Sequence, residues 1–218
     1  MRRVVCAALV AFGLAGCGNN PPVPDWQMNA RGALERAQEA YLSGDSRIEG
    51  VEFARARTEV ARTGRADLLA RLELARCATR VASLVREACA GFEALRADAA
   101  PPEQAYAAYL AGQAGAPAGV ALLPEQHRPF AGGTMPGAQR LQEVADPLAR
   151  LVAAGVLLQT GRADPAVIAL ATETASAQGW RRPLLAWLGV QAQRAAAAGD
   201  GAEAERIRRR MALVTGLR

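Results

Sequence analysis

Thr160-Gly161-Arg162-Ala163-Asp164 repeats a stretch from the first half of the chain, Thr63-Gly64-Arg65-Ala66-Asp67. Glycine after a helix supplies a left-handed cap, and aspartate can cap the helix that follows. Gly44-Asp45 and Gly199-Asp200 have the same order. Turns this short join antiparallel helix pairs, so the sequence predicts an all-α fold of antiparallel helical hairpins.

The composition agrees with close-packed helices. Just over half of the residues are apolar, aromatic residues are scarce and alanine is abundant, which suits helices better than a sheet. One helix face is marked by apolar residues at three-and-four spacing, Leu74, Cys77, Ala78, Val81 and Leu84. The expected helices are 25–42 with Asp25 as its N-cap, 46–62, one from near 67, 101–112, 138–160 with an interruption at Pro147, 164–178, 183–198 and 201–215.

The helical pattern is interrupted by residues 113–137, which contain nine Gly and Pro residues. The interruption predicts an N-terminal helical half, 25–112, and a C-terminal helical half, 138–218. Long irregular stretches inside compact domains are uncommon, and they are usually functional or mark a boundary. This connecting segment is therefore the first place to look for a binding surface.

The connecting segment contains apolar and aromatic residues that could dock in a groove: Leu122, Leu123, His127 and Phe130. Binding sites favour loops that a rigid scaffold holds in place. We therefore expect these four residues to form a partner-contact segment that lines or covers the principal groove, with a short helix within 122–128. The alternative is a free linker without contacts.

The last two hairpins resemble tetratricopeptide repeats. The resemblance rests on the small and large residues around the turns, Ala154, Leu157, Ala166 and Leu170 beside Gly161, and Ala192, Ala195 and Ala204 beside Gly199. The two turns are 38 residues apart, where the repeat has about 34, and Arg208 stands where an aromatic residue or Leu is usual. The resemblance implies a C-terminal half of TPR-like or α-solenoid-like hairpins, which form grooves for partner segments.

The chain opens with the three parts of a secretory signal: Met1-Arg2-Arg3, an uncharged apolar run over 4–14, and a small-residue exit. The apolar run is shorter than the roughly 20 residues that span a bilayer as a helix. Leu14-Ala15-Gly16-Cys17 resembles the lipobox of bacterial lipoproteins. The resemblance implies a signal peptide, 1–16, and a tether, 17–24, from a diacylglycerol-bearing Cys17. The alternative is a plain secretory signal with an incidental cysteine.

A lipid anchor determines the expected compartment and partners. Two acyl chains already give stable anchoring, so the body should face the periplasm at a membrane. The residue after the cysteine is Gly18 and not Asp. By resemblance to sorted Gram-negative lipoproteins, this favours the outer membrane. We expect membrane lipid, through acylated Cys17, and other envelope proteins as partners. Without Arg2 and Arg3 the net charge is about +3, which is ordinary, and no nucleic acid is expected.

Cys77 and Cys89 are candidates for a disulfide in a compartment that permits one. Twelve residues of unbroken helix would part them by about 18 Å, whereas a disulfide needs Cα atoms about 4.4–6.8 Å apart. A bridge therefore requires the helix to end near Leu84-Val85 and the chain to turn back. The alternative is a pair of buried thiols.

The sequence offers few residues for catalysis. All 26 basic side chains are arginine, which excludes Schiff-base lysines and Ser-Lys dyads. His127 is the only histidine, no Gly-x-Ser-x-Gly elbow accompanies it, and we expect it to be a surface loop residue. No phosphate loop or dinucleotide fingerprint occurs. We predict no catalytic residue, no cofactor and no metal site.

Other conspicuous side chains have structural explanations. Tyr106 and Tyr109 share a predicted helix face, and Trp180 and Trp187 fall near the start of another predicted helix. We expect all four to be packing residues. The arginines within 206–210 point in different directions on a helix, so they are expected on a solvated face.

Fold analogy favours a non-catalytic protein-interaction or scaffold module. The alternative is a cell-wall (peptidoglycan) enzyme that uses acidic residues. Lytic transglycosylases resemble lysozyme and use a Glu commonly followed by Ser, and no Glu-Ser occurs here. A cleft with two facing carboxylates would favour the enzyme, and an apolar or Arg-lined groove would favour the binding module.

Overall fold

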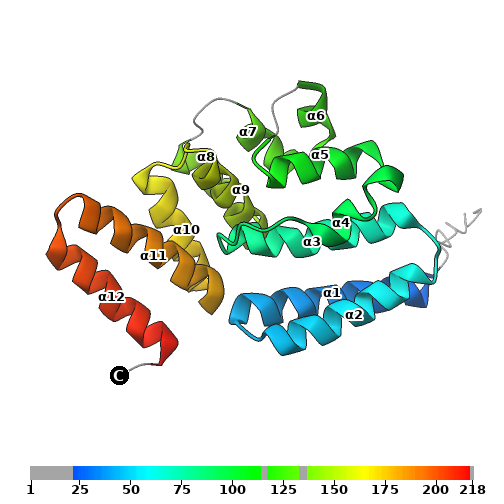
Figure 1. The fold of residues 1–218 in the computed structure, drawn as a ribbon, viewed down its shortest axis with the longest axis horizontal. Coiled ribbons are helices and arrows are strands. Elements are labelled where there is room, and N and C mark those ends of the chain that lie inside the picture. The colour runs from blue at the N-terminus through cyan, green and yellow to red at the C-terminus, as the bar shows by residue number, and fades with distance from the viewer. Residues whose placement is uncertain (1–21, 114–116, 133–136, 217–218) are drawn as a thin grey trace, which may run out of the picture.

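The computed structural model describes residues 22–113, 117–132 and 137–216, so Cys17 lies outside the described residues. Within these ranges it contains twelve α-helices, two short 3-10 helices and no strand, which confirms the all-α class (Figure 1). None of the described helices is long and apolar enough to cross a membrane. The elements are α1 (Asp25–Ser43), α2 (Ser46–Ala61), α3 (Ala66–Ala82), α4 (Ala90–Glu93), η1 (Arg96–Asp98), α5 (Pro101–Leu110), α6 (Pro117–Leu122), η2 (Glu125–His127), α7 (Arg128–Ala131), α8 (Ala138–Gln142), α9 (Pro147–Gln159), α10 (Pro165–Ala177), α11 (Arg181–Ala197) and α12 (Gly201–Thr215).

The first hairpin pairs α1 with α2 (Figure 1). Gly44 takes the left-handed conformation, with φ 99°, and ends α1. The side chain of Asp45 then accepts the backbone N–H of Ile48 and caps α2. The prediction that Asp25 caps α1 is wrong, because Pro24 occupies the cap position and Asp25 lies in the first turn. There its carboxylate still interacts favourably with the helix dipole.

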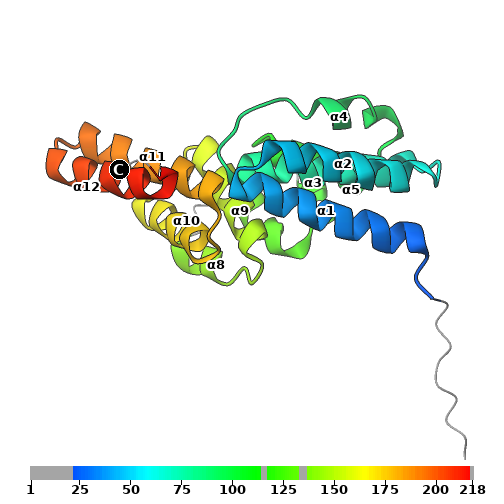
Figure 2. The ribbon, with the colours of Figure 1, turned by 90° about the horizontal axis from the view of Figure 1, so that it is seen from below.

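The C-terminal hairpins follow the same rule. Gly161 and Gly199 are left-handed, with φ of 72° and 77°. Asp164 caps α10 through the backbone N–H of Val167, and Asp200 caps α12 through that of Glu203. Successive helices α9 to α12 therefore pack as neighbours, as the repeated turns predict (Figures 1 and 2).

The stretch expected as one helix over 138–160 is two helices, α8 and α9. Pro147 is the first residue of α9, and Asp146 caps it by accepting the backbone N–H of Ala149 at 2.6 Å. Proline at this position has no N–H to lose and a dihedral angle that suits a helix start. The interruption considered at Pro147 is thus a helix boundary.

The two halves expected from the sequence share one hydrophobic core. Buried side chains from α1, α3, α5, α9, α11 and α12 belong to the same cluster. Helix α9 lies against α3, where a Cβ on Gly155 would be only 2.4 Å from the carbonyl oxygen of Val81. Gly155, which has no Cβ, therefore allows the backbones of α3 and α9 to approach this closely. A smaller cluster fills the space between α1, α2 and α3.

Helix α3 ends at Ala82, two residues before the predicted turn, and Leu84 is left-handed with φ 58°. The chain then runs back along α3, and Cys77 and Cys89 come to disulfide distance, with Cα atoms 5.9 Å apart. Because α3 ends at Ala82, the chain can turn back and bring the two Cα atoms within the range that a disulfide needs.

Replacing Cys77 or Cys89 with serine is expected to lower the melting temperature in oxidising buffer. The cysteines are 12 residues apart, and closing a loop of this size stabilises by about 3 kcal/mol in the chain-entropy model, within a measured range of about 0–5. Thermal unfolding followed by circular dichroism measures the difference. In reducing buffer each variant should melt close to the reduced parent protein. Quantitative labelling of both thiols in protein taken from the periplasm would contradict the bridge.

Candidate functional site

The principal cavity lies where the connecting segment meets the helical body. It has a volume of about 530 Å³ and is lined by α3, α5, α9, Gln38 of α1, and residues 122–124 and 126–127. Its wall is mainly apolar, from Leu74, Ala78, Leu123 and Val152. Small-molecule sites are concave, mostly apolar and roughly 300–1,000 Å³ in size, with a few polar groups. This cavity is the best candidate site in the described part of the chain.

The connecting segment docks on the helical body through its buried side chains. Leu123 and Phe130 are buried in the main core, whereas Leu122 is 42% exposed at the cavity rim. Arg162, from the turn before α10, donates to the carbonyl oxygens of Phe130 and Gly132. The described part of the segment is therefore not a free linker, because its side chains pack in the core and its backbone carbonyls bind Arg162.

His127 is buried, with only 2% of its surface exposed, so the expectation of a surface loop residue is wrong. Its ring lies against two tyrosines of α5, with ring centroids 5.5 Å from Tyr106 and 5.0 Å from Tyr109. Burial lowers the pKa of His127 from 6.5 to about 4, and the Asp146 carboxylate opposes this in part. The imidazole is therefore neutral at pH 7. The Gly and Pro residues nearby suggest a loop, but the segment docks on α5 and buries the ring.

The free energy of unfolding is expected to fall as the pH falls from about 6.5 to about 4. In this window an unfolded His127 binds a proton and the folded one does not, so the limiting slope is about 1.4 kcal/mol per pH unit. Urea unfolding at closely spaced pH values measures the slope. His127→Phe keeps an aromatic ring beside the tyrosines and should reduce it. An identical slope in this variant would rule out His127 as its source.

The polar centre of the cavity is an ion pair that the sequence analysis missed. Arg71 of α3 donates from Nε at 2.9 Å and from Nη2 at 2.6 Å, both to Oε1 of Glu103. Glu103, in the first turn of α5, is 5% exposed, and its Oε2 has no hydrogen-bond partner among the described residues. The same holds for Nδ1 of His127, another residue of the cavity wall. In the sequence, the only indication of this ion pair was that Glu103 lies three residues before Tyr106, on the same helix face. Nothing in the sequence indicated Arg71.

A smaller cavity of about 220 Å³ adjoins the first and shares Gln38 and Leu148 with it. Its wall includes three carboxylates, Glu35, Glu39 and Asp146. Each is engaged. Glu35 pairs with a neighbouring arginine of α1, Glu39 accepts from Ser43 Oγ and Trp180 Nε1 at 3.0 Å each, and Asp146 caps α9. Glu39 joins α1 to Trp180 before α11, Asp146 caps α9, and the three carboxylates together make the wall of this smaller cavity acidic.

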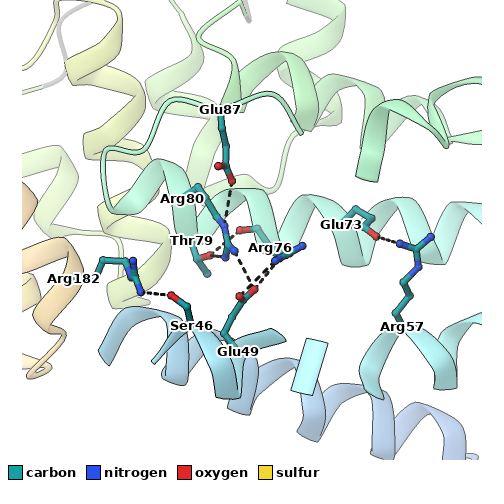
Figure 3. A network of polar contacts seen from close by, with 9 residues as sticks. All are labelled: Ser46, Glu49, Arg57, Glu73, Arg76, Thr79, Arg80, Glu87 and Arg182. Carbon is teal, nitrogen blue, oxygen red and sulfur yellow. Dashed lines mark hydrogen bonds and ion pairs between the residues drawn. The ribbon is translucent and has the colours of Figure 1, made fainter. Parts of the chain in front are cut away.

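A second polar cluster lies away from the cavity, between α2 and α3 (Figure 3). Glu49 of α2 is 4% exposed and accepts from Arg76 Nε at 2.8 Å and from Arg80 Nη2 at 3.0 Å. Arg80 also pairs with Glu87 at 3.3 Å, and its guanidinium lies over the ring of Tyr41. This cluster joins α2 to α3 and, through Glu87, to the stretch that follows α3, and we assign it a structural role.

In the described residues, no group of three or more His, Cys, Asp and Glu side chains is placed to hold a metal ion. Comparisons with protein-family models, with curated proteins and with solved structures find no match to this chain. The fold and the site define a class in structural terms only: packed helical hairpins with a mainly apolar cavity that contains one ion pair, between Arg71 and Glu103.

Proposed function

We propose that this chain is a lipoprotein held at the periplasmic face of the outer membrane by acylated Cys17, and that its helical body is a non-catalytic protein-interaction or scaffold module. The anchor is supported by a positively charged start, an uncharged apolar run over 4–14 and the Leu14-Ala15-Gly16-Cys17 box, which follow one another in that order. Helix α1 begins at Asp25, and the residues from Gly18 to Pro24 reach at most about 25 Å when stretched. The body would therefore stay close to the membrane surface.

One observation favours a binding module over a cell-wall enzyme. Glycosidases generally place two carboxyl groups on either side of the bond that is cut. The wall of the principal cavity contains one carboxylate among its described residues, Glu103, and Arg71 already holds one of its oxygens. The carboxylates of the adjoining cavity have partners of their own. A mainly apolar cavity whose one carboxylate is already paired fits binding better than hydrolysis.

The anchor is tested on the mature protein. Mass spectrometry of its N-terminal peptide should find Cys17 as the first residue, carrying diacylglycerol. Cys17→Ser should move the protein from the membrane fraction to the soluble fraction, while Cys77→Ser, a matched cysteine change, should leave it in the membrane. An unmodified amino terminus at any residue after Cys17 would contradict the anchor.

The interaction role is tested by crosslinking the anchored protein in its own envelope, followed by pull-down and mass spectrometry. We expect the same envelope proteins to be captured in repeat experiments and to be lost when the protein carries Cys17→Ser. Release of soluble fragments from purified peptidoglycan by the wild-type protein, abolished by Glu103→Gln, would contradict the non-catalytic proposal and favour the enzyme.

A further inference from the structure

The principal cavity combines a closed apolar floor with apolar side chains that remain accessible. The floor consists of Leu74, Leu123 and Val152, which are almost completely buried. Nearer to solvent, Leu122 is 42% exposed and Leu148 is partly exposed. Apolar surface that stays in contact with water gains free energy when a ligand covers it, and a concave site can cover most of a small ligand. The cavity is therefore suited to an apolar body.

The charges of the cavity wall cancel one another. Arg71 and Glu103 are the charged side chains among its described residues at pH 7, and they bind each other at 2.6 Å. Burial lowers the pKa of His127 to about 4, so its ring is neutral at that pH. Glu103 Oε2 and His127 Nδ1 have less than 1 Å² of accessible surface, so a ligand in the cavity does not reach them. An ion entering the cavity would lose water without finding an unpaired countercharge, which costs free energy.

The other polar groups of the wall are uncharged. Gln38 is partly exposed and Gln126 is exposed, and neither side-chain amide is hydrogen-bonded to another described residue. A side-chain amide both donates and accepts hydrogen bonds, so it can bind a hydroxyl, an ester or another amide. These two glutamines therefore match a ligand whose polar end carries no charge.

We propose that the cavity binds a small uncharged amphiphile. Its alkyl chain packs against Leu122, Leu148 and the buried floor, and its hydroxyl, ester or amide end lies at the amides of Gln38 and Gln126. The volume of about 530 Å³ lies within the range of small-molecule sites, roughly 300–1,000 Å³.

The test is isothermal titration calorimetry at pH 7 with three probes of equal chain length: octanol, octanoate and octylammonium. The protein is the chain from residue 17 with Cys17→Ser, which keeps both hydrophobic clusters, since these use only residues 30–214. We expect saturable binding of octanol, tighter than either ion by about tenfold or more because only the ions lose a charged hydration shell. Hexanol should bind about fifteenfold more weakly than octanol, since each buried methylene contributes about fourfold. The result depends neither on acylation nor on a protein partner, so it is separate from the proposed function.

Two variants with matched controls assign the binding to the cavity. Ala75→Leu fills the cavity wall and should weaken octanol binding by about tenfold or more, whereas Ala54→Leu, on the exposed face of α2, should leave it unchanged. Leu122→Gln replaces an exposed apolar side chain of the wall and should weaken octanol binding severalfold. Leu213→Gln makes the same change on α12, where Leu213 is 80% exposed, and should have no effect.

The proposal is overturned if octanol does not bind saturably, if either ion binds as tightly as octanol, or if folded Ala75→Leu binds octanol like the parent protein. Should Ala75→Leu fail to fold, as judged by circular dichroism, the comparison of Leu122→Gln with Leu213→Gln decides. Equal octanol affinities in these two variants also overturn the proposal.

Discussion

Trp187→Ala is expected to lower the free energy of unfolding by about 3–5 kcal/mol, the range found when large aromatic side chains are removed from well-packed cores. Trp187 is fully buried in the middle of α11. Its Nε1 donates to the carbonyl oxygen of Ala82, the last residue of α3, at 3.1 Å. The change therefore leaves a cavity and also an unpaired carbonyl between the N-terminal and C-terminal parts of the core.

Urea unfolding followed by circular dichroism measures this loss as a shift of the midpoint at constant slope. Trp26→Ala is the matched control, because Trp26 lies in the first turn of α1 and is only partly buried. It should cost clearly less. Equal losses in the two variants would show that burial of Trp187 between α3 and α11 is not what sets its contribution.

Glu49→Ala should destabilise the protein by a similar amount, about 3–5 kcal/mol, because removing one partner of a buried ion pair leaves a charge without compensation. Arg80, only 10% exposed at its side chain, would keep just Thr79 and the more exposed Glu87 as polar partners (Figure 3). Arg76 would lose its bonds to the same carboxylate. The α2–α3 contact should therefore weaken.

The control is Glu205→Ala, which removes a glutamate from a solvent-exposed pair with Arg208 on α12. Exposed pairs contribute roughly 0–1 kcal/mol, so this variant should unfold close to the wild type. Both are measured by urea unfolding in the same buffer. If Glu49→Ala were as stable as Glu205→Ala, the buried network would not be what holds α2 against α3.

The two copies of the five-residue turn show which features of a turn can be predicted from its own residues and which depend on the residue that follows. Gly64 and Gly161 are both left-handed, as predicted. Asp164 caps α10, whereas Asp67 lies inside α3 and pairs with Arg65 at 2.6 Å. The difference comes from the next residue. Pro165 favours the first helical position and disfavours a helical conformation at Asp164, while Leu68 imposes neither restriction.

The proximity of Cys77 and Cys89 could also be predicted from the sequence. The distance argument for Cys77 and Cys89 required an end to the helix near Leu84, and the helix ends at Ala82. That argument needs only chain geometry over a short interval. The burial of His127 was not accessible in the same way, because the tyrosines that bury it precede it by about twenty residues and a Pro/Gly-rich stretch intervenes.

The sequence by itself determined the all-α class, the hairpins and most helix ends, because caps, prolines and left-handed glycines act through contacts within a few residues. Only the tertiary structure decided which side chains form the candidate site. Arg71 meets Glu103 across 32 residues of chain, and Arg80 meets Glu49 across 31. Such pairs form only when helices cross at one particular rotation and depth, and that geometry depends on how all the apolar faces pack at once.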